Sequence, residues 1–239
     1  MASDLVLRLD HFLNALPTIA TRPELADAVT TVSAPLGLPT VMAGTVLVRG
    51  DKVVKGFQFG NWPSTWTQEY IESVMAVDPV VHAARRRMSP FTWTELFATG
   101  ELSRKTIRDL MAAVEGYGWY DGLAVPIHGP GGYVGLVAFA GGRIDLSPLD
   151  RSLLVALSHA AHQHARKLFT IDVALPKLTG RELHVMRWVG RGKTDTEIAS
   201  ILDLSVATVH SYVEQAKRKL GAHSRSQAVN ELLMHELIQ

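Results

Sequence analysis

The residues best suited to hold a small molecule are concentrated between positions 61 and 93. This stretch contains aromatic side chains and one carboxylate next to a proline, namely Trp62, Trp66, Tyr70, Trp93 and Asp78. Trp66 and Tyr70 are four residues apart and would share one face of a helix. Apolar walls with a few placed hydrogen-bonding groups are typical of a small-molecule pocket. The alternative is that the aromatic residues form an ordinary core and that Asp78 caps a helix.

A second set of residues, near the C-terminus, has the pattern of a nucleic-acid-binding module. Thr179-x-x-Glu182 and Thr194-x-x-Glu197 are capping boxes, and Ser205 can cap a third helix, so three short helices are predicted between 178 and 220. Only Asp203 and Leu204 separate the second helix from the Ser205 cap. A connection this short is typical of a helix-turn-helix.

The third of these helices is predicted to present a polar face. Its apolar stripe is Val209, Val213, Ala216 and Leu220, and the stripe of the second helix is Ile198, Ala199, Ile201 and Leu202. The exposed side then carries hydrogen-bonding residues followed by cations, namely Thr208, His210, Ser211, Glu214, Gln215, Lys217, Arg218 and Lys219. Such a surface suits base edges and phosphates. The alternative is a helical hairpin in a protein-interaction module.

Other patterns favour plain structural interpretations. His159, His162 and His164 are spread around a helix with no carboxylate or Cys to complete a metal set, so we expect a solvated face and no metal site. The glycine cluster at 129–132 lacks the Lys and Ser or Thr of a phosphate loop and predicts a turn. Arg85–Arg87 predicts a solvated helix end. No catalytic residues and no cofactor are expected, so an enzyme is disfavoured.

Length and composition set the broad class. The chain has 239 residues, enough for two domains, and it contains no cysteine, which leaves neither a disulfide framework nor a zinc–thiolate site. We expect a cytoplasmic protein, because no signal peptide and no membrane-spanning segment is recognisable. The formal net charge is only +1, so affinity for DNA would come from clustered charges and from dimerisation.

The order of predicted elements indicates an α+β fold. Helices are expected at about 4–16, 21–35, 65–75, 79–88, 103–116 and 147–168, with a hairpin over 40–60 that breaks near Gly50-Asp51 and strands at 121–128 and 133–140. This order predicts an α/β/α sandwich around an antiparallel sheet over residues 1–170. A linker at 171–177 would lead to an all-α domain of four helices at 178–239.

The C-terminal motifs LTGRE, GKTDTEIA, LSVATV and KLGAHSRSQAV resemble the DNA-binding domain of LuxR-type transcription regulators. Met186 stands where Leu is usual, and Tyr212 stands where a His is common. The resemblance implies a homodimer that places two recognition helices on an inverted repeat of double-stranded DNA, with RNA polymerase as a further partner left open. It places Val206, Ala207, His210, Ser211 and Glu214 near bases and Thr194, Lys217, Arg218 and Lys219 near phosphates.

The helix from Ser226 to Ile238 is the segment that we expect to form the self-complementary contact of that dimer. It could use Ala228, Leu232 and His235, or Leu233, Glu236 and Ile238.

The N-terminal motifs WPSTWTQEY, VDPV, SPFTW and GYGWYDGLAVPIHG are similar to the autoinducer-binding domain of LuxR-type quorum-sensing regulators. Such domains bind N-acyl-homoserine lactones. By this resemblance, the Trp66 indole N–H would donate to the lactone carbonyl and Asp78 would accept from the ligand amide N–H. Tyr70 and Trp93 would wall the pocket.

Two departures from the family pattern bear on the ligand. Trp62 stands where many relatives have a Tyr that reaches the acyl carbonyl, and Ala138 stands where many have Ser or Thr. Both changes remove hydroxyl groups near the acyl chain, which favours a signal without a 3-oxo group whose acyl part is short, branched or aromatic.

Three alternatives remain open: a ligand-independent or ligand-inhibited regulator, a two-component response regulator, and a lactone hydrolase. The last two lack the acidic receiver pocket and the nucleophile that they would need.

Overall fold

The computed structural model describes residues 2–45, 47–49, 52–54, 58–70, 74–75, 77–129, 133–169, 178–234 and 237–238. The chain divides into two compact units: the first is formed by most of residues 1–171, and residues 172–239 make up most of the second. The predicted linker at 171–177 lies outside the described residues. Within the described ranges, no helix is both long enough and apolar enough to cross a membrane.

The N-terminal unit is built on an antiparallel sheet whose strands lie in the order β4-β1-β7-β6-β5. These strands are β1 (Thr40–Thr45), β4 (Gln58–Gly60), β5 (Phe91–Thr92), β6 (Asp121–Gly129) and β7 (Tyr133–Gly141). Strand β1 pairs antiparallel with both β4 and β7, and β5 pairs antiparallel with β6. The strands predicted at 121–128 and 133–140 are confirmed. Residues 130–132 of the predicted turn between them lie outside the described residues.

A separate two-stranded hairpin lies between β1 and β4 in the sequence. Its strands are β2 (Leu47–Arg49) and β3 (Lys52–Val54), with Arg49 opposite Lys52. A hairpin within 40–60 was predicted and is confirmed by these strands. Gly50 and Asp51, where the break was expected, lie outside the described residues.

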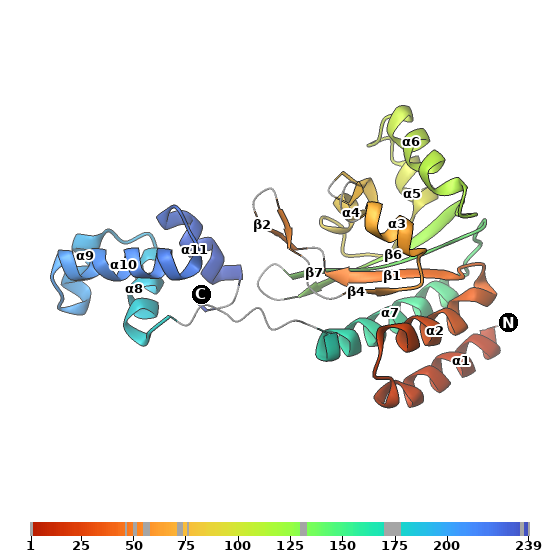
Figure 1. The fold of residues 1–239 in the computed structure, drawn as a ribbon, viewed down its shortest axis with the longest axis horizontal. Coiled ribbons are helices and arrows are strands. Elements are labelled where there is room, and N and C mark those ends of the chain that lie inside the picture. Colours follow the sequence, from red (N-terminus) through yellow and green to blue (C-terminus); the bar gives the residue numbers. More distant parts are fainter. Residues whose placement is uncertain are drawn as a thin grey trace. The chain divides into compact units, whose positions relative to one another are not determined.

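Helices cover both faces of the sheet, so the predicted α/β/α sandwich is confirmed (Figure 1). One face is covered by α1 (Ala2–Ala15), α2 (Arg22–Ser33) and α7 (Pro148–Phe169). The other is covered by α3 (Ser64–Glu69), α4 (Pro79–Ala84), α5 (Trp93–Ala98) and α6 (Arg104–Glu115). Helix α5 was not predicted, although Thr92 and Glu95 form a capping box at its start, a pattern that the sequence displays.

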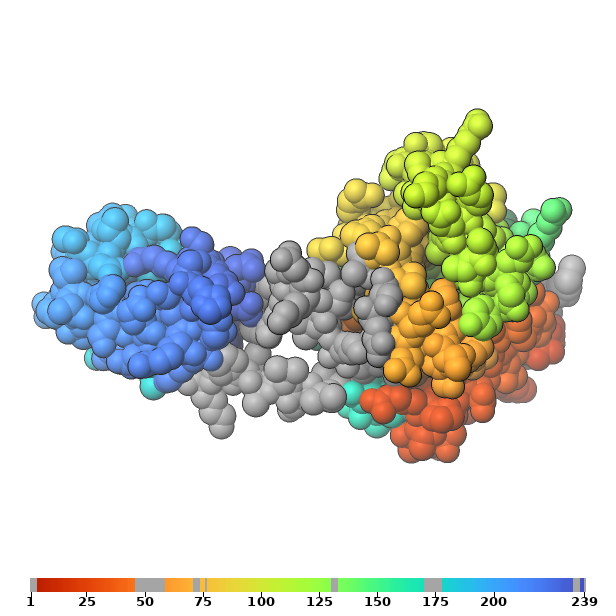
Figure 2. Space-filling view, turned by 45° about the horizontal axis from the view of Figure 1, so that its top comes forward, coloured from red at the N-terminus to blue at the C-terminus, as the bar shows by residue number. Residues whose placement is uncertain are grey.

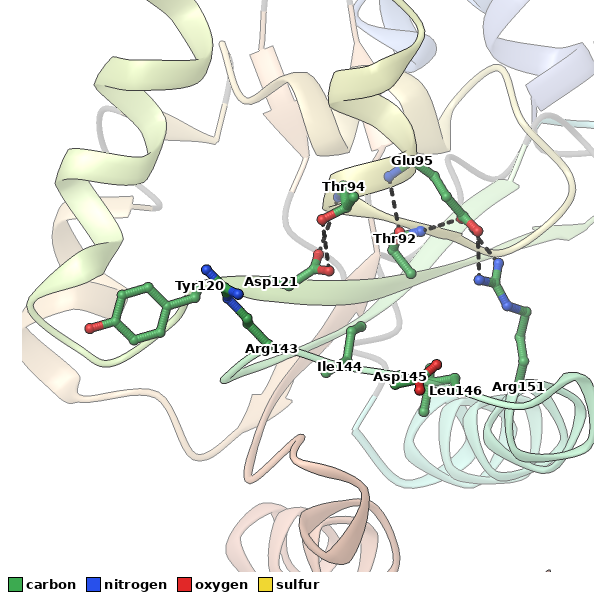
Figure 3. Close-up of a pocket in the computed structure, with 10 residues that line it drawn as sticks. All are labelled: Thr92, Thr94, Glu95, Tyr120, Asp121, Arg143, Ile144, Asp145, Leu146 and Arg151. Carbon is green, nitrogen blue, oxygen red and sulfur yellow. Dashed lines mark hydrogen bonds and ion pairs between the residues drawn. The ribbon is translucent and has the colours of Figure 1, made fainter.

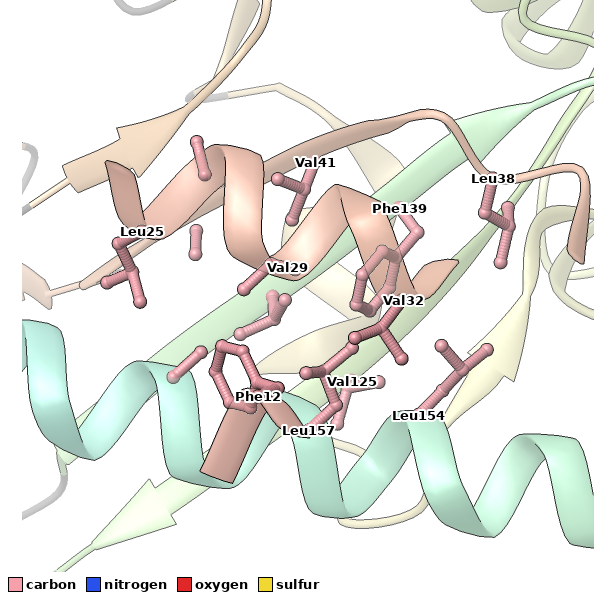
Figure 4. Packing of buried hydrophobic residues seen from close by; sticks show 14 of the residues in the cluster. Phe12, Leu25, Val29, Val32, Leu38, Val41, Val125, Phe139, Leu154 and Leu157 are labelled. Atoms are coloured by element: carbon pink, nitrogen blue, oxygen red, sulfur yellow. The ribbon is translucent and has the colours of Figure 1, made fainter. Parts of the chain in front are cut away.

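The core beneath the sheet is apolar and closely packed. Helix α7 contributes Leu154 and Leu157, the sheet contributes Val41 and Phe139, and all four side chains are buried (Figure 4). Burying a side chain of this size contributes about 1.5–3 kcal/mol. Packing on this face stabilises the sheet without using the residues of the opposite face.

The expectation of a solvated histidine face on α7 is wrong for His162, which is only 1% exposed. Its Nε2 lies 3.1 Å from the Tyr133 hydroxyl, and burial together with the charge of Arg166 lowers the pKa of His162 to about 4. The ring fits because Gly135 has no side chain: a Cβ there would lie 2.1 Å from Nε2. His164 is half-buried and donates from Nε2 to the Ile19 carbonyl at 2.8 Å.

The C-terminal unit consists of α8 (Gly180–Gly190), α9 (Asp195–Leu202), α10 (Val206–Leu220) and α11 (Arg225–Met234). The predicted capping boxes at Thr179 and Thr194 and the Ser205 cap are all present. The predicted stripe of α10 packs into the core, and so do Ile198 and Ala199 of α9. The prediction that Ile201 belongs to the apolar stripe of α9 is wrong. Its side chain is 44% exposed, because Ile198, Ala199 and Leu202 already form the inward face of this short helix.

The predicted self-complementary surface on the last helix is wrong for three of the residues proposed for it. Ala228, Leu232 and Ile238 are buried in the core of their own unit, so they cannot contact a second copy. Leu233 is exposed, whereas His235 and Glu236 lie outside the described residues. The prediction treated these apolar residues as available to a second copy, but they complete the small core between the four helices.

Candidate ligand-binding and nucleic-acid-binding sites

The aromatic residues singled out in the sequence come together on the sheet face that α3–α6 cover. Trp66, Tyr70 and Trp93 are buried, and Trp62 is half-buried. The ring centroids of Trp62 and Tyr70 are 5.0 Å apart at right angles, and those of Trp66 and Tyr70 are 5.9 Å apart. Figure 2 shows the orange segment that contains α3 and the yellow-green segment that contains α6 next to each other at the surface.

Two further aromatic residues belong to the cluster and were not predicted as site residues. Trp119 lies 5.2 Å from Trp62, and Tyr117 lies 5.5 Å from Trp66 and 5.1 Å from Trp119, all between ring centroids. They come from the segment between α6 and β6, far from 61–93 in the sequence. The density of aromatic and glycine residues in Gly116–Tyr120 was the available signal.

The polar atoms of the tryptophans distinguish this cluster from an ordinary core. The indole Nε1 atoms of Trp62, Trp66 and Trp93 are buried, and none has a hydrogen-bond partner within the described part of the chain. A buried donor without a partner costs about 1–3 kcal/mol, and native proteins keep few of them. Three such donors in one cluster make it a candidate site for a molecule with hydrogen-bond acceptors.

Asp78 supplies the matching acceptor and is itself buried. Its Oδ1 accepts from the Val80 backbone N–H at 2.7 Å, which caps α4, and its Oδ2 accepts from the Tyr70 hydroxyl. Burial raises the pKa of Asp78 above its ordinary value, against the opposing effect of the hydrogen bond from Tyr70. Asp78 therefore caps a helix, as the structural interpretation expected. A carboxylate has about four lone-pair sites, so the bonds from Tyr70, Val80 and Val81 leave room for one further donor.

Local hydrogen bonds place the cluster residues. The side chain of Asn61 accepts from the Val41 N–H at 2.8 Å and donates to the Pro39 carbonyl at 3.0 Å, which anchors the segment that carries Trp62. Asp121 accepts from the Thr94 N–H and hydroxyl at 3.2 and 2.9 Å, which holds the start of α5.

Trp93 is placed against the sheet by a glycine. A Cβ at Gly122 would lie 2.6 Å from Cε2 of Trp93 and 2.4 Å from the Phe139 carbonyl oxygen. Ala138 lies on β7 opposite Met42, half-buried against the same cluster. At this position the chain presents a methyl group and no hydroxyl, so the polar groups of the site are concentrated at the tryptophans and Asp78.

A separate hollow of about 570 Å³ lies at the start of β6, and its lining is polar (Figure 3). Glu95 and Arg151 form a two-pronged ion pair across it, at 2.6 and 3.0 Å. Asp121 uses both carboxylate oxygens on Thr94 and Gly122. Within the described residues, this hollow therefore has no buried side-chain donor without a partner of the kind that marks the aromatic cluster.

Helices α9 and α10 form the predicted helix-turn-helix. Asp203 ends α9 in the left-handed region at φ 54°, and Ser205 starts α10 by accepting from the Thr208 N–H at 3.1 Å. Of the predicted base-contacting residues, all five are exposed: Val206, Ala207, His210, Ser211 and Glu214. They line one side of α10, as the apolar stripe required. Thr194, at the start of α9, is exposed as well.

The predicted phosphate contacts differ in their present partners. Lys217 donates to both oxygens of Glu214 at 2.8 and 3.0 Å, and Lys219 donates to the buried carboxylate of Glu182 at 2.7 Å. Arg218 is exposed and has no ion pair with a described residue. Among these cations, Arg218 is thus the one most available to a phosphate. Taken together, the two units define a DNA-binding regulator with a small-molecule sensor.

The chain belongs to the luxR family of bacterial regulatory proteins. Residues 21–165 match the model of the autoinducer binding domain, and residues 176–232 match the model of the luxR-family regulatory domain. It is 32% identical over 181 residues to the HTH-type quorum sensing-dependent transcriptional regulator RpaR of Rhodopseudomonas palustris, covering 75% of this chain and 74% of RpaR. It is 28% identical over 229 residues to the transcriptional activator BjaR1 of Bradyrhizobium diazoefficiens, covering 95% and 94% of the two chains.

Solved structures share the fold. SdiA of Escherichia coli superposes with a TM-score of 0.70 at 21% identity, over 97% of this chain and 98% of SdiA. CepR2 of Burkholderia cenocepacia, described as an N-acylhomoserine lactone dependent LuxR family factor, superposes with a TM-score of 0.54 at 19% identity, over 69% and 97%. The protein is accordingly a quorum-sensing transcription regulator and not an enzyme, with an autoinducer-binding domain and a DNA-binding helix-turn-helix.

Proposed function

We propose that the N-terminal unit binds an N-acyl-homoserine lactone within the aromatic cluster of Trp62, Trp66, Tyr70, Trp93 and Trp119. The observation that carries this proposal is the set of three buried indole N–H groups without partners beside a buried carboxylate. An acyl lactone offers carbonyl oxygens for the indoles and one amide N–H for the carboxylate. Binding would therefore satisfy donors that cost the empty protein free energy.

The polar contacts follow from the chemistry of each residue. The Trp66 N–H donates to the lactone carbonyl, and Asp78 accepts from the amide N–H while it keeps its bonds to Tyr70 and Val80. Tyr70 and Trp93 form walls around the lactone. A site built in this way rejects molecules that leave one of its buried groups unpaired.

The acyl part of the signal is short, branched or aromatic and lacks a 3-oxo group. Trp62 retains a donor at the position where relatives have a hydroxyl, and its N–H reaches the acyl carbonyl. Ala138 offers no hydrogen bond to an additional oxygen further along the chain. The tilted rings of Trp62, Trp119 and Tyr117 make a wall that suits an aroyl or branched group.

The C-terminal unit binds promoter DNA as part of a homodimer in the cytoplasm. Two copies of α10 would enter successive major grooves of an inverted repeat, about 34 Å apart. Val206, Ala207, His210, Ser211 and Glu214 face the bases, and Thr194, Lys217, Arg218 and Lys219 face the phosphates. The bound signal stabilises the folded protein by mass action, since the unfolded chain has no site for it. Contact with RNA polymerase would couple binding to transcription.

The ligand is tested by expressing the full chain with a panel of acyl- and aroyl-homoserine lactones and identifying co-purifying molecules by mass spectrometry. Octanoyl-rac-glycerol belongs in the panel, because a structure of SdiA is described as a complex with it. We expect one lactone without a 3-oxo group at one per chain. A soluble protein that is empty across the panel would identify a ligand-independent regulator, and equal or better retention of 3-oxo lactones would contradict the acyl assignment.

Paired variants test whether the indole donors are responsible. Trp66→Phe removes one unpartnered donor and keeps an aromatic ring, whereas Trp188→Phe removes an indole of α8, in the C-terminal unit and outside the cluster. We expect Trp66→Phe to retain less of the lactone and Trp188→Phe to retain as much as the unmodified chain. Equal retention by both variants would contradict the role of the donors.

The DNA assignment is tested with Arg218→Gln and a duplex selected from a random library by the full chain. We expect binding to weaken by a similar factor on selected and unrelated duplexes, with a salt slope reduced by about one. A loss confined to the selected duplex would move Arg218 from the phosphates to the bases.

A further inference from the structure

The DNA-facing side of α10 is linked to the two neighbouring helices by a chain of polar contacts. Arg225, the first residue of α11, bonds through Nη1 to Oδ1 of Asp195 and donates from Nη2 to the Lys193 carbonyl at 2.7 Å. Asp195 is the first residue of α9, and its other oxygen, Oδ2, lies 3.4 Å from Nδ1 of His210 on α10. The contacts therefore run from Arg225 through Asp195 to His210.

This arrangement fixes the carboxylate and orients the imidazole. Because Arg225 occupies Oδ1, Asp195 turns Oδ2 toward His210, and the side chain of Asp195 is only 19% exposed. An ionised carboxylate only accepts hydrogen bonds, so a ring that keeps this contact holds a proton on Nδ1. The imidazole is 67% exposed, and Nε2 has no partner among the described residues. Only Nε2 is left to contact DNA.

The protonation state of His210 then decides which base edge it can contact. A neutral ring with its proton on Nδ1 can only accept at Nε2, whereas the imidazolium donates there and suits the N7 and O6 acceptors of guanine. Asp195 and Glu214 are the anions near the ring, while Arg225 is neutralised by Asp195 and Lys217 by Glu214. Arg218 and His223 line the same hollow as His210; the positive charge of Arg218 opposes protonation of the ring, and DNA phosphates favour it.

We propose that His210 reads the operator as an imidazolium held by Asp195, so that operator binding takes up a proton at each recognition helix. Asp195 and Arg225 are positioning residues for His210. The inference rests on the proposed DNA binding and adds a specificity-determining residue with a stated charge. Its consequence is that operator affinity rises as the pH falls, up to tenfold per pH unit for each helix.

The test measures binding of the full chain, with its co-purifying ligand, to a duplex selected from a random library at pH 6.5. Fluorescence anisotropy between pH 6 and 8 at constant ionic strength gives the slope of affinity against pH. We expect His210→Gln to abolish the slope and His184→Gln, which alters an exposed histidine of α8, to keep it. A slope that survives in His210→Gln would overturn the inference, and so would pH-independent binding by the unmodified chain.

A double-mutant cycle tests the role of Asp195 separately. Asp195→Asn should reduce affinity for the selected duplex at least threefold more in the unmodified chain than in the His210→Gln background, with melting curves to confirm that each variant folds. Equal effects in both backgrounds would overturn the positioning role. Absence of binding to any duplex at any pH would overturn the proposed DNA binding as well, which distinguishes that failure from the failure of this inference.

Discussion

In the C-terminal unit the buried carboxylate of Glu182 accepts two hydrogen bonds at Oε2, from the Thr179 N–H at 2.6 Å and from Lys219 at 2.7 Å. In the N-terminal unit, by contrast, three buried indole donors have no described partner. Burial raises the pKa of Glu182, but the contacts with Lys219 and Thr179 outweigh burial and lower it overall; the pKa of Asp78 remains raised. Among the described residues, the DNA-binding unit has no buried side-chain donor without a partner, whereas the sensing unit has three.

Among the substitutions that test this contrast, Glu182→Ala is expected to have the largest effect on stability. Two charge-assisted or capping hydrogen bonds disappear, and we expect a loss of about 3 kcal/mol in the free energy of unfolding of the C-terminal unit. Hydrogen exchange read by mass spectrometry reports the two units separately. Glu214→Ala, which removes an exposed ion pair in the same unit, serves as the control and should change nothing measurable. Equal effects of the two substitutions would contradict the importance of burial.

The second-largest expected effect is a pH dependence of the free energy of unfolding, which is confined to the N-terminal unit. The pKa of His162 is lowered to about 4 from its ordinary 6.5, so between these values the unfolded chain binds a proton that the folded chain does not. The contribution of the neutral His162 to the free energy of unfolding is fully present above pH 6.5. It decreases as the pH falls, by about 2 kcal/mol between pH 7.5 and 5. Urea unfolding at several pH values measures it. His162→Gln should remove this slope, and a slope unchanged in that variant would show that other groups cause it.

A smaller effect on stability, with a clear sign for binding, is expected for Trp66→Phe. The ligand-free variant should be within about 1 kcal/mol of the parent, because relief of an unpartnered donor offsets the lost ring contact. Its affinity for the lactone should fall about tenfold, since the lactone carbonyl then has no donor. Isothermal titration measures the affinity. A ligand-free variant that is several kcal/mol less stable would mean that the indole N–H already has a partner.

The smallest effect is expected where a local cap is removed from the C-terminal unit. Ser205→Ala leaves the Thr208 N–H without its side-chain acceptor and should cost about 1 kcal/mol. Ser200→Ala, at an exposed position within α9, is the matched control and should be neutral. Urea unfolding compares the two. A neutral result for Ser205→Ala would mean that water replaces the cap without loss.

Local features of both units were readable because their causes lie within a few residues. The boxes at Thr179 and Thr194 each join atoms three residues apart, so residue type and spacing are sufficient to predict them. The same rule would have found α5 from Thr92 and Glu95, which was overlooked. The composition of residues 61–93 likewise predicted where the aromatic side chains and Asp78 would lie close together.

Contacts between distant segments were not readable in this way. Trp119 joins Trp62 because the strand that follows it, β6, lies between β7 and β5 in the sheet, and no spacing in the sequence encodes that distance. His162 was expected in solvent because helical periodicity describes only its own helix. Its burial depends on Gly135 of β7, which leaves room for the ring.

Residue types and short spacings were therefore enough to establish the caps, the helix-turn-helix and the family resemblance, because short-range hydrogen bonds and helical periodicity act within one segment. Whether each polar group finds a partner depended on segments far apart in the chain. The orphaned indoles, the link from Arg225 through Asp195 to His210, and the buried His162 all arise where separate helices and strands meet. Tertiary packing sets such meetings, since burial and distance belong to the assembled fold.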